Sequence, residues 1–444
     1  MNSRKQKVLF ITYYFPPSGG PGVLRPLKFV RHLLAMQWQP VVLTVKENAH
    51  FFVRDAELRQ WIPEKATVVR TRIFEPYALY TKLTGKESGA FLDSATLSVS
   101  EDRKKSLTEK ISLFIRSWLF IPDARIGWLI PAVLAGLKTI RREKPEVILT
   151  SGPPNTTHLI GLTLKMLTGL RWVADFRDPW FKYLVPQRSY LIPQKTDAWL
   201  GRSVVHRADA VIAVCQGVKQ ELIQSFGQEI AGKIKIITNG YSQDFFDAVP
   251  ATREKSDKFI LAYVGSIYHR YDFRPFLKAV DELFAENPAF RQHLQLQIIG
   301  SLEETARKWF ADAGCSDSIR LPGHFSYFAA LQAMKQATVL LLYIMDNERG
   351  KNIPTSKLYE YLGSQRPILA LSPQDSDAAK IIDRTGAGII VSPADVTGIK
   401  KALSRLFEMW QSETLDAAFL EPEKRRNFEM TTLTAQLIET LVRK

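Results

Sequence analysis

Short apolar runs recur along the chain, separated by longer stretches in which apolar and polar positions follow helical spacing. Runs of four to six residues, bounded by turn residues, are typical of parallel strands that crossover helices bury on both faces. The pattern therefore predicts a doubly wound α/β domain in the first half of the chain. Its expected strands are residues 8–13, 41–45, 147–150, 172–175, 210–214 and 234–237.

The same pattern starts again after the turn Asn239-Gly240-Tyr241 and a polar stretch that ends at Lys258. A second doubly wound domain is expected there, and ligands should bind at the carboxyl ends of strands in the cleft between the two domains. We predict a first domain over 1–240, a linker over 241–257, a second domain over 258–422, and a C-terminal helix over 423–444 that could pack back on the first domain. The strands of the second domain are expected at residues 259–264, 294–299, 339–343, 368–371 and 388–391.

One stretch, at about residues 74–127, departs from this organisation. It shows no clear strand and carries the basic run Arg103-Lys104-Lys105, followed by apolar positions up to Ile121. An amphipathic insertion in a compact domain is usually functional or mobile. The alternative is a solvated basic face over a core helix.

Charge is distributed unevenly between the two halves. Up to Gly240 there are 35 Lys and Arg against 19 Asp and Glu, whereas from Tyr241 onward there are 25 against 26. A basic half suggests nucleic acid, an anionic membrane or phosphorylated substrates as partners. Residues 117–137 are too interrupted by charges and prolines to span a membrane. The two cysteines cannot build a disulfide framework or a Cys-based zinc site, so a reducing cytosol is the default.

Glycines follow the first predicted strand. Gly19 and Gly20 precede a helix expected from about Leu24. Glycines at a strand-to-helix turn let a substrate approach the backbone, and a helix N-terminus favours anions. A dinucleotide fingerprint needs a third glycine, but Arg25 follows Leu24, which argues against a dehydrogenase.

A second helix start lies in the second domain. Pro354 suits the first helical turn, Thr355 and Ser356 offer hydroxyls and free amides, and Lys357 adds positive charge, so this segment could hold a diphosphate. Glu360 lies one turn further along, where its carboxylate could bind a ribose diol. The alternative is a capped helix with a surface glutamate.

Several segments, taken together and in order, resemble the bacterial family 4 glycosyltransferases. The resemblance spans nearly the whole chain and implies the GT-B architecture, in which two Rossmann-like domains face each other and the second holds most of the sugar nucleotide. It also implies transfer from a nucleoside diphosphate sugar with retained anomeric configuration. The segments are residues 8–27, 151–158, 174–180, 238–241 and 357–362.

The resemblance implies roles for residues of the second domain. Glu360 matches the second carboxylate of the family's Glu-x7-Glu signature, which holds the donor ribose, while Asn352 stands in place of the first. The loop that begins Gly265-Ser266 resembles a glycine turn followed by cationic phosphate ligands, with Arg270 and Arg274 as alternatives. His324 lies in a loop that resembles the one contacting the base.

In the first domain, His158 follows a predicted strand and turn, and it is expected at a helix start facing the cleft. With the resemblance, we predict a role beside the transferred sugar; the alternative is a structural histidine. Asp175, Arg177 and Asp178 end the next strand, on the acceptor side. One aspartate could pair with Arg177 and fix the loop, while the other, Asp178, could receive the proton of the acceptor hydroxyl.

A metal site is not expected. Asp375 and Asp377 have the Asp-x-Asp spacing of another glycosyltransferase architecture, yet they precede a helix that an aspartate would cap well. Lys357, an arginine and the helix N-terminus could instead stabilise the leaving diphosphate without a cofactor.

The sequence therefore predicts a hexosyltransferase-type enzyme of cell-surface polysaccharide or glycolipid synthesis. Its expected partners are a nucleotide sugar, a glycan or lipid-linked acceptor and the anionic inner face of the cell membrane, where it would be cytoplasmic and peripheral. A GT-B epimerase or hydrolase is the main alternative. A nucleic-acid-binding protein would explain the basic half, but no aromatic-basic RNA motif or helix-turn-helix signature accompanies it.

Overall fold

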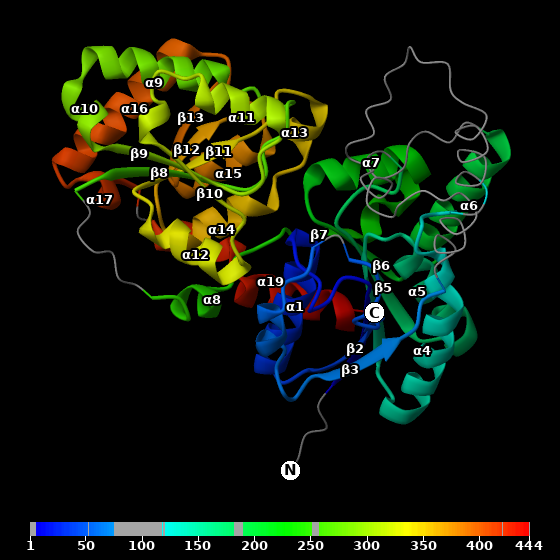
Figure 1. Cartoon of the computed structure of the whole chain (residues 1–444). Helices are drawn as coiled ribbons and strands as arrows, with labels where there is room; N and C mark the ends of the chain where they lie inside the picture. The colour runs from blue at the N-terminus through cyan, green and yellow to red at the C-terminus, as the bar shows by residue number, and fades with distance from the viewer. Residues whose placement is uncertain are drawn as a thin grey trace. The chain divides into compact units, whose positions relative to one another are not determined.

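The structure is a computed structural model that describes residues 6–443, apart from residues 52, 75–117, 119, 182–189, 251–256 and 420. It divides into two compact units (Figure 1). Unit 1 comprises Met1–Thr238 and Thr434–Lys444, and unit 2 comprises Asn239–Leu433. The basic run 103–105 and most of the predicted insertion lie outside the described residues.

The described residues of unit 1 form a seven-stranded parallel sheet in the order β3-β2-β1-β4-β5-β6-β7. The strand order reverses between β1 and β4, where Thr12 lies beside Ser151. In such sheets the crevice at the reversal is the usual place for a ligand. The strands are β1 (Lys7–Thr12), β2 (Gln39–Val45), β3 (Thr67–Thr71), β4 (Val147–Gly152), β5 (Arg171–Phe176), β6 (Ala210–Ala213) and β7 (Ile234–Ile236).

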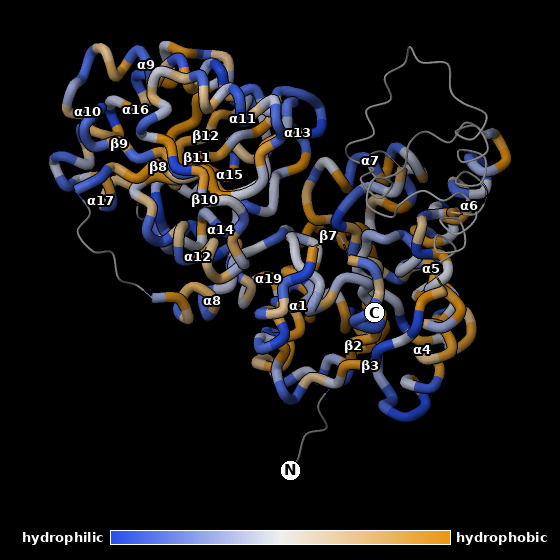
Figure 2. The backbone as a smooth tube through the Cα atoms, viewed as in Figure 1, coloured by the Kyte–Doolittle hydropathy of each residue, from blue (hydrophilic) through white to orange (hydrophobic). Residues whose placement is uncertain are grey.

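Helices of unit 1 cover both faces of this sheet. Right-handed crossovers place α1, which connects β1 to β2, on the face opposite to the helices that lead from β3 to β6. The strands are the most apolar part of the unit (Figure 2), and Val8, Leu9, Phe10 and Ile11 of β1 are fully buried. The helices are α1 (Pro21–Ala35), α4 (Leu129–Glu143), α5 (Thr156–Thr168), α6 (Leu191–Arg207) and α7 (Gln216–Phe226), with 3₁₀ turns at Glu57–Trp61, Ile126–Trp128 and Gln228–Lys233.

The described residues of unit 2 form a six-stranded parallel sheet in the order β10-β9-β8-β11-β12-β13, which reverses between β8 and β11. Its strands are β8 (Phe259–Val264), β9 (Leu294–Ile299), β10 (Ile319–Gly323), β11 (Val339–Tyr343), β12 (Ile368–Leu371) and β13 (Gly388–Val391). The helices that surround it are α9 (Arg274–Glu286), α10 (Pro288–His293), α11 (Glu304–Ala311), α12 (Tyr327–Gln336), α13 (Glu348–Asn352), α14 (Ser356–Ser364), α15 (Asp377–Thr385), α16 (Val396–Gln411), α17 (Leu415–Phe419) and α18 (Pro422–Arg425).

The two doubly wound parallel sheets confirm the predicted fold class. The five strands expected in the second half match the observed bounds. Strands β3 and β10 were not predicted. Both are outermost in their sheets; most residues of β3 are half-buried, and the central residues of β10 are exposed. Helix α1 begins at Pro21, three residues before the expected Leu24.

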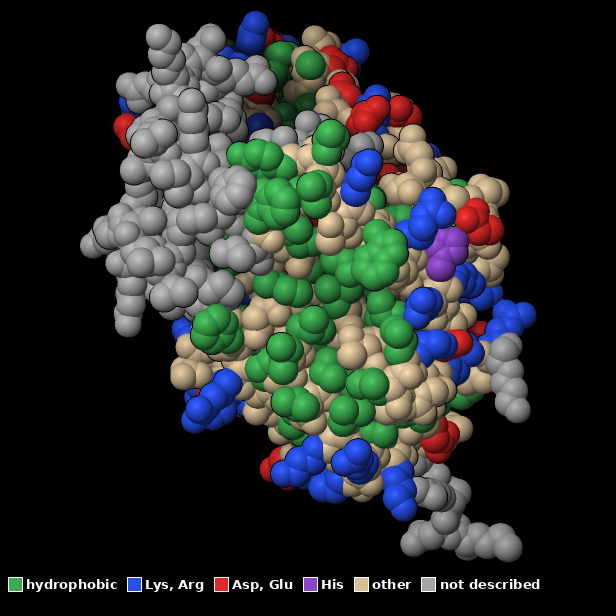
Figure 3. Space-filling model, turned by 90° about the vertical axis from the view of Figure 1, so that its right-hand side faces the viewer, with side chains coloured by type: hydrophobic (Ala, Val, Ile, Leu, Met, Phe, Trp, Pro, Cys, Tyr) green, Lys and Arg blue, Asp and Glu red, His purple; other side chains and the backbone are tan. Residues whose placement is uncertain are grey.

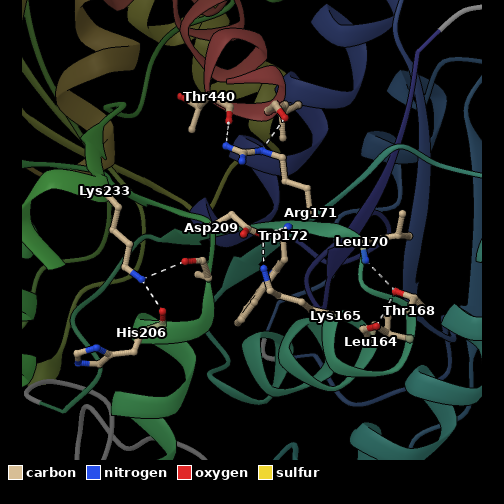
Figure 4. A network of polar contacts seen from close by, with 12 residues as sticks. Leu164, Lys165, Thr168, Leu170, Arg171, Trp172, His206, Asp209, Lys233 and Thr440 are labelled. Carbon is tan, nitrogen blue, oxygen red and sulfur yellow. Dashed lines mark hydrogen bonds and ion pairs between the residues drawn. The ribbon is translucent and has the colours of Figure 1, made fainter. Parts of the chain in front are cut away.

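We predicted a single helix over residues 423–444, but the structure has two. Helix α18 is followed by a 3₁₀ turn at Arg426–Phe428, and α19 begins only at Met430 (Met430–Val442). The end of α19 is held in unit 1 by Arg171 at the start of β5. Its guanidinium donates to the carbonyls of Thr440 and Leu441 at 3.1 and 3.0 Å (Figure 4). Beside it, Asp209 accepts hydrogen bonds from the Trp172 amide and from Lys165.

The segment predicted as a linker begins with a helix, α8 (Gln243–Asp247). Phe245 of α8 is fully buried, and its ring contacts those of Tyr327 and Phe328 at centroid distances of 5.9 and 5.4 Å. Residues 241–250 therefore contribute to the core of unit 2. Residues 251–256 lie outside the described part.

Candidate active site

In unit 2 the loops that follow the neighbouring strands β8 and β9 approach each other, next to the strand-order reversal between β8 and β11. Gly265 has φ +140° and Gly300 has φ +143°, which side chains rarely tolerate. A Cβ atom on Gly300 would collide with the Gly265 carbonyl, and the Gly265 amide donates to the Ile299 carbonyl at 2.8 Å. Glycine at both positions lets these backbones pack closely beneath the predicted donor site.

Lys357 lies directly over Gly265. Its Nζ donates to the Tyr263 hydroxyl at 2.8 Å and lies 4.2 Å from the centroid of the same ring, and a Cβ atom on Gly265 would collide with it. Within the described residues, no carboxylate lies at ion-pair distance from this amine. Burial lowers the pKa of Lys357 to about 7. An anion bound here would supply the missing negative charge and favour the protonated amine.

The first turn of α14 presents backbone amides beside this lysine. Thr355 is the N-cap residue, and its side chain makes no capping hydrogen bond. Pro354 precedes the cap and does not occupy the first turn, contrary to the expectation. Tyr361 fixes the helix to the sheet, because its hydroxyl accepts from the Val264 amide at 2.9 Å and donates to the Leu341 carbonyl at 3.3 Å. Ser356 and Lys357 thus begin a rigidly held helix N-terminus, which favours an anion.

Glu360 is one turn inside α14 and only 7% exposed. Burial, together with the Glu360 carboxylate beside it, raises the pKa of Tyr327 well above its usual value. Tyr327 therefore keeps its proton and can act as a hydrogen-bond donor beside this carboxylate. Sequence reasoning missed both Tyr263 and Tyr327, because an aromatic residue in a strand or at a helix start is expected to belong to the hydrophobic core.

Asn352, which stands where the family has its first carboxylate, is the exposed last residue of α13. The segment is built tightly, because a Cβ atom on Gly350 would collide with the Met345 carbonyl, and the Gly350 amide donates to the side chain of Asn347 at 2.9 Å. Lys351 pairs with Asp375 at 3.2 Å. The role of Asn352 as a donor ligand stays a prediction.

The expectation that an aspartate caps α15 is wrong, because Ser376 caps it and accepts from the Ala379 amide at 3.0 Å. Asp377 lies in the first turn and pairs with Lys380 at 3.0 Å. The described residues contain no group of three or more His, Cys, Asp or Glu that could hold a metal ion.

The remaining donor-side candidates occupy the loops after β8 and β10. Arg274, the first residue of α9, already pairs with Asp272 at 2.8 Å. Arg270 is exposed and lies 5.6 Å from the centroid of the Tyr268 ring, and no described carboxylate is at ion-pair distance from it. Arg270 is therefore better able than Arg274 to bind a phosphate. Ser266 is half-buried beside Gly265, and His324 is exposed after β10.

In unit 1, Asp175 is part of a buried ion pair. Its carboxylate accepts from Arg25 at 2.8 and 3.0 Å and from the Ser151 hydroxyl at 2.7 Å, and the residue is 2% exposed. Arg25 also donates to the Ile237 and Thr238 carbonyls. Asp175 therefore has a structural role in unit 1, and its role on the acceptor side stays a prediction.

Arg177 also has a structural role in this geometry. It is buried and donates to the carbonyls of Gly152 at 2.9 Å, Pro153 at 2.8 Å and Gly22. These bonds tie the loop after β5 to the end of β4, to the residue that follows β4 and to the first turn of α1. Asp178, the next residue, is half-buried and remains the predicted acceptor for the proton.

His158 lies in the first turn of α5, at the helix start that was expected, and it is fully buried. Its Nδ1 lies 2.9 Å from the Thr150 hydroxyl, and its ring stacks on Phe176 at 4.3 Å. Its Nε2 has no hydrogen-bond partner among the described residues. Burial lowers the pKa of His158 to about 3, so the imidazole is neutral at physiological pH. Its role beside the sugar stays a prediction.

Two further features of unit 1 bear on the predicted site. Asp123 caps α5, accepting from the Thr156 amide and hydroxyl, both at 2.8 Å, a role that sequence reasoning missed.

Gly20 has φ +80°, and a Cβ atom on Gly19 would meet Val53. The conformation of the turn thus accounts for both glycines, and their contact with a donor stays a prediction.

Comparison with known proteins identifies the class. The Glycosyltransferase Family 4 model matches residues 96–245, and the Glycosyl transferases group 1 model matches residues 258–409. The two matches together cover more than half of the chain, one in each half. The chain therefore belongs to the family 4-like glycosyltransferases of GT-B fold and is a nucleotide-sugar glycosyltransferase, as the sequence predicted. No curated protein sequence matches it.

Solved structures agree with the fold over nearly the whole chain. HepE from Anabaena, in complex with UDP and glucose, matches with TM-score 0.63 and 14% identity over 99% of this chain and 100% of that one. A glycosyltransferase from Rickettsia africae matches with TM-score 0.60 and 12% identity over 99% and 100%. Sucrose-phosphate synthase from Thermosynechococcus elongatus matches with TM-score 0.58 and 15% identity over 98% of each chain.

Proposed function

We propose that this enzyme transfers a sugar from a nucleoside diphosphate sugar to a glycan or lipid-linked acceptor, with retention of anomeric configuration. The observation that carries the proposal is the amine of Lys357, which lies over Gly265 at the start of α14 without a carboxylate partner among the described residues. A half-buried amine beside backbone amides fits a diphosphate. The UDP and glucose in the HepE structure support a donor of this chemical class.

In the proposed reaction, the bond between the sugar C1 and the diphosphate oxygen breaks, and a bond between C1 and the acceptor oxygen forms on the same face. Negative charge develops on the leaving diphosphate, where Lys357, Arg270 and the amides of α14 stabilise it. Glu360 binds the ribose diol. The departing phosphate takes the acceptor proton, and no metal ion is required.

We further propose that the enzyme acts in cell-surface polysaccharide or glycolipid synthesis, as a cytoplasmic protein at the inner face of the cell membrane. The excess of Lys and Arg before Gly240 supports an anionic surface as partner. No helix among the described residues has the length and apolar character of a membrane span. Nucleic acid is not a proposed partner.

The proposal is tested by a screen of nucleoside diphosphate sugars. A donor at 100 times its Kd should raise the free energy of unfolding by about 2.7 kcal/mol, measured as a shift in Tm. The stabilising donor is then incubated with candidate acceptors, and the products are separated. A glycosylated acceptor with retained configuration supports the proposal. Release of free sugar or of an epimer would point to the hydrolase or epimerase alternative.

A further inference from the structure

Large hydrophobic side chains gather on one outer face of unit 1. In the described part of the chain, eight large hydrophobic residues are 61% or more exposed, and seven of them lie on α4, α5 and α6. Helices α4 and α5 pack together, as do α5 and α6. Figure 3 shows hydrophobic side chains across this face, with Lys and Arg at its margins. We call it the α4–α6 face: Ile130, Leu134, Met166, Leu167, Leu191, Ile192 and Trp199.

Apolar and basic residues share the same exposed stripe on each outer helix. On α4, Leu134 is followed one turn later by Lys138. On α6, Ile192, Lys195, Trp199 and Arg202 recur at spacings of three and four residues, which places them along one side. A helix that presents Trp or Leu beside Lys and Arg to solvent is typical of interfacial membrane binding.

The charge on this face has one sign. Six exposed Lys and Arg lie on α4 and α6, whereas no Asp or Glu of α4, α5 or α6, which are described throughout, is exposed. Glu143 is half-buried and pairs with Lys7, and Asp197 is buried and accepts from the Trp180 indole. The six cations are Lys138, Arg141, Arg142, Lys195, Arg202 and Arg207.

The apolar residues of α4 and the first turn of α6 lie toward the carboxyl edge of the unit 1 sheet, whereas Met166 and Leu167 lie in the last turn of α5, toward the opposite edge. Helix α4 begins beside the end of β3, where the Trp128 indole donates to the Thr71 hydroxyl at 2.7 Å. Tyr190, which precedes α6, contacts the ring of Trp118 at 6.5 Å between centroids. Aromatic side chains with a polar tip favour the boundary between water and lipid. The same edge carries Asp178 after β5.

We propose that the α4–α6 face docks on the surface of an anionic membrane, with its apolar side chains among the headgroups and its cations on lipid phosphates. A second copy of the chain would set two faces of the same charge against each other. A nucleic acid would leave the exposed Leu and Ile side chains without apolar partners. Access to a lipid-linked acceptor as the purpose of docking rests on the proposed function, but docking itself is measured without donor or acceptor.

The experiment is co-sedimentation of the full chain with neutral phosphatidylcholine vesicles and with vesicles containing phosphatidylglycerol. A first variant carries Lys138→Gln, Lys195→Gln and Arg202→Gln, none of which has an ion-pair partner among the described residues. Each cation near an anionic surface contributes about fivefold to the partition coefficient, so binding should fall about 100-fold. A matched control removes three exposed lysines elsewhere in unit 1, by Lys46→Gln, Lys65→Gln and Lys235→Gln.

A second variant carries Leu134→Ser, Ile192→Ser and Trp199→Ser, and should bind anionic vesicles at least tenfold more weakly. Its control is Ile236→Ser, Leu321→Ser and Val442→Ser, all exposed outside the face. Unchanged Tm and unchanged donor affinity in every variant would show that fold and donor site are intact. Absence of donor binding by the wild type would overturn the proposed function and leave the docking test standing.

Binding to anionic vesicles that both face variants lose and both controls keep supports docking. Equal binding to neutral and anionic vesicles, equal loss in the controls, or no binding at all would overturn it. Concentration-dependent self-association that the apolar variant abolishes would identify the face as an interface between copies. Salt-sensitive binding to DNA or RNA without vesicle binding would identify a nucleic-acid surface. Both of these results also overturn the proposal.

Discussion

The two units share a doubly wound parallel sheet but use the reversal of strand order differently. In unit 1, polar groups at this edge satisfy one another, because Asp175 binds Arg25 and Ser151. In unit 2, the corresponding edge holds the amine of Lys357 without a carboxylate partner among the described residues. Polar residues at a sheet edge therefore do not by themselves define a ligand site. What distinguishes unit 2 is the half-buried amine of Lys357, which has no carboxylate partner among the described residues.

The outer surfaces of the units also differ, because unit 1 exposes more large hydrophobic side chains and more positive charge than unit 2. Among the described residues of unit 2, Leu321 is the single exposed large hydrophobic residue, and the charges from Tyr241 onward nearly balance. Unit 1 carries the positive charge and the α4–α6 face. The comparison suggests that unit 2 contributes the donor chemistry and unit 1 the contact with the acceptor's surroundings.

The largest expected effect is the loss of stability on replacing Asp175, compared with the loss on replacing Glu360. Asp175→Ala leaves Arg25 buried without its partner, so we expect the free energy of unfolding to fall by about 3–5 kcal/mol. The measurement is chemical denaturation followed by circular dichroism. Glu360→Ala serves as the comparison and should change stability much less, because its site is built for a ligand. A stable Asp175→Ala protein would mean that this pair is dispensable for the fold.

Lys357→Ala should reduce kcat by about 100- to 1,000-fold, the usual cost of removing one donor that stabilises developing negative charge. Initial rates at saturating donor and acceptor measure this. Lys308→Ala is the control, because Lys308 is an exposed lysine of the same unit. A rate within threefold of the wild type would remove Lys357 from the reaction.

The fold was largely predictable because its central strands are buried on both faces and read as continuous apolar runs. The exceptions have a physical cause. Strands β3 and β10 lie at the edges of their sheets, and residues such as Arg70 and Arg320 interrupt the apolar pattern there. The C-terminal helix was overextended because local composition does not reveal the turn at Arg426–Phe428.

The site was predictable only where sequence neighbours carry it. Thr355, Lys357 and Glu360 lie in or beside one helix, so their spacing alone placed them together. Tyr263 and Tyr327 come from distant segments, and tertiary packing alone brings them to Lys357 and Glu360. In unit 1, spacing suggested exposed chemistry for Asp175, whereas burial and Arg25 give it a structural role.

Glu360→Ala should weaken donor binding at least tenfold, since truncation of one partner of a buried charged hydrogen bond costs about 2–5 kcal/mol. Calorimetric titration of the donor into the purified variant measures the change. Glu304→Ala, an exposed carboxylate of the same unit, is the matched control and should bind like the wild type. Unchanged affinity in Glu360→Ala would exclude it as the ribose ligand.

Donor affinity should depend on pH through Lys357. Burial lowers its pKa to about 7, so the amine is charged below this pH and loses its proton as pH rises through it. A diphosphate binds the charged form, and Kd should increase by up to tenfold per pH unit above 7. In Lys357→Arg the guanidinium stays charged, so its profile between pH 6 and 9 should be flat. Parallel profiles in the two proteins would contradict this account.

The smallest expected effect is that of metal removal. If Lys357, Arg270 and the amides of α14 carry the charge of the leaving diphosphate, transfer should continue at an unchanged rate in excess chelator. Asp375 pairs with Lys351 and Asp377 with Lys380, so both carboxylates already have cationic partners. The control is recovery of the same rate after addition of Mg²⁺ or Mn²⁺. Loss of transfer with chelator, and its restoration by one of these ions, would assign a metal to the diphosphate. The site in unit 2 would then not rely on cationic side chains alone.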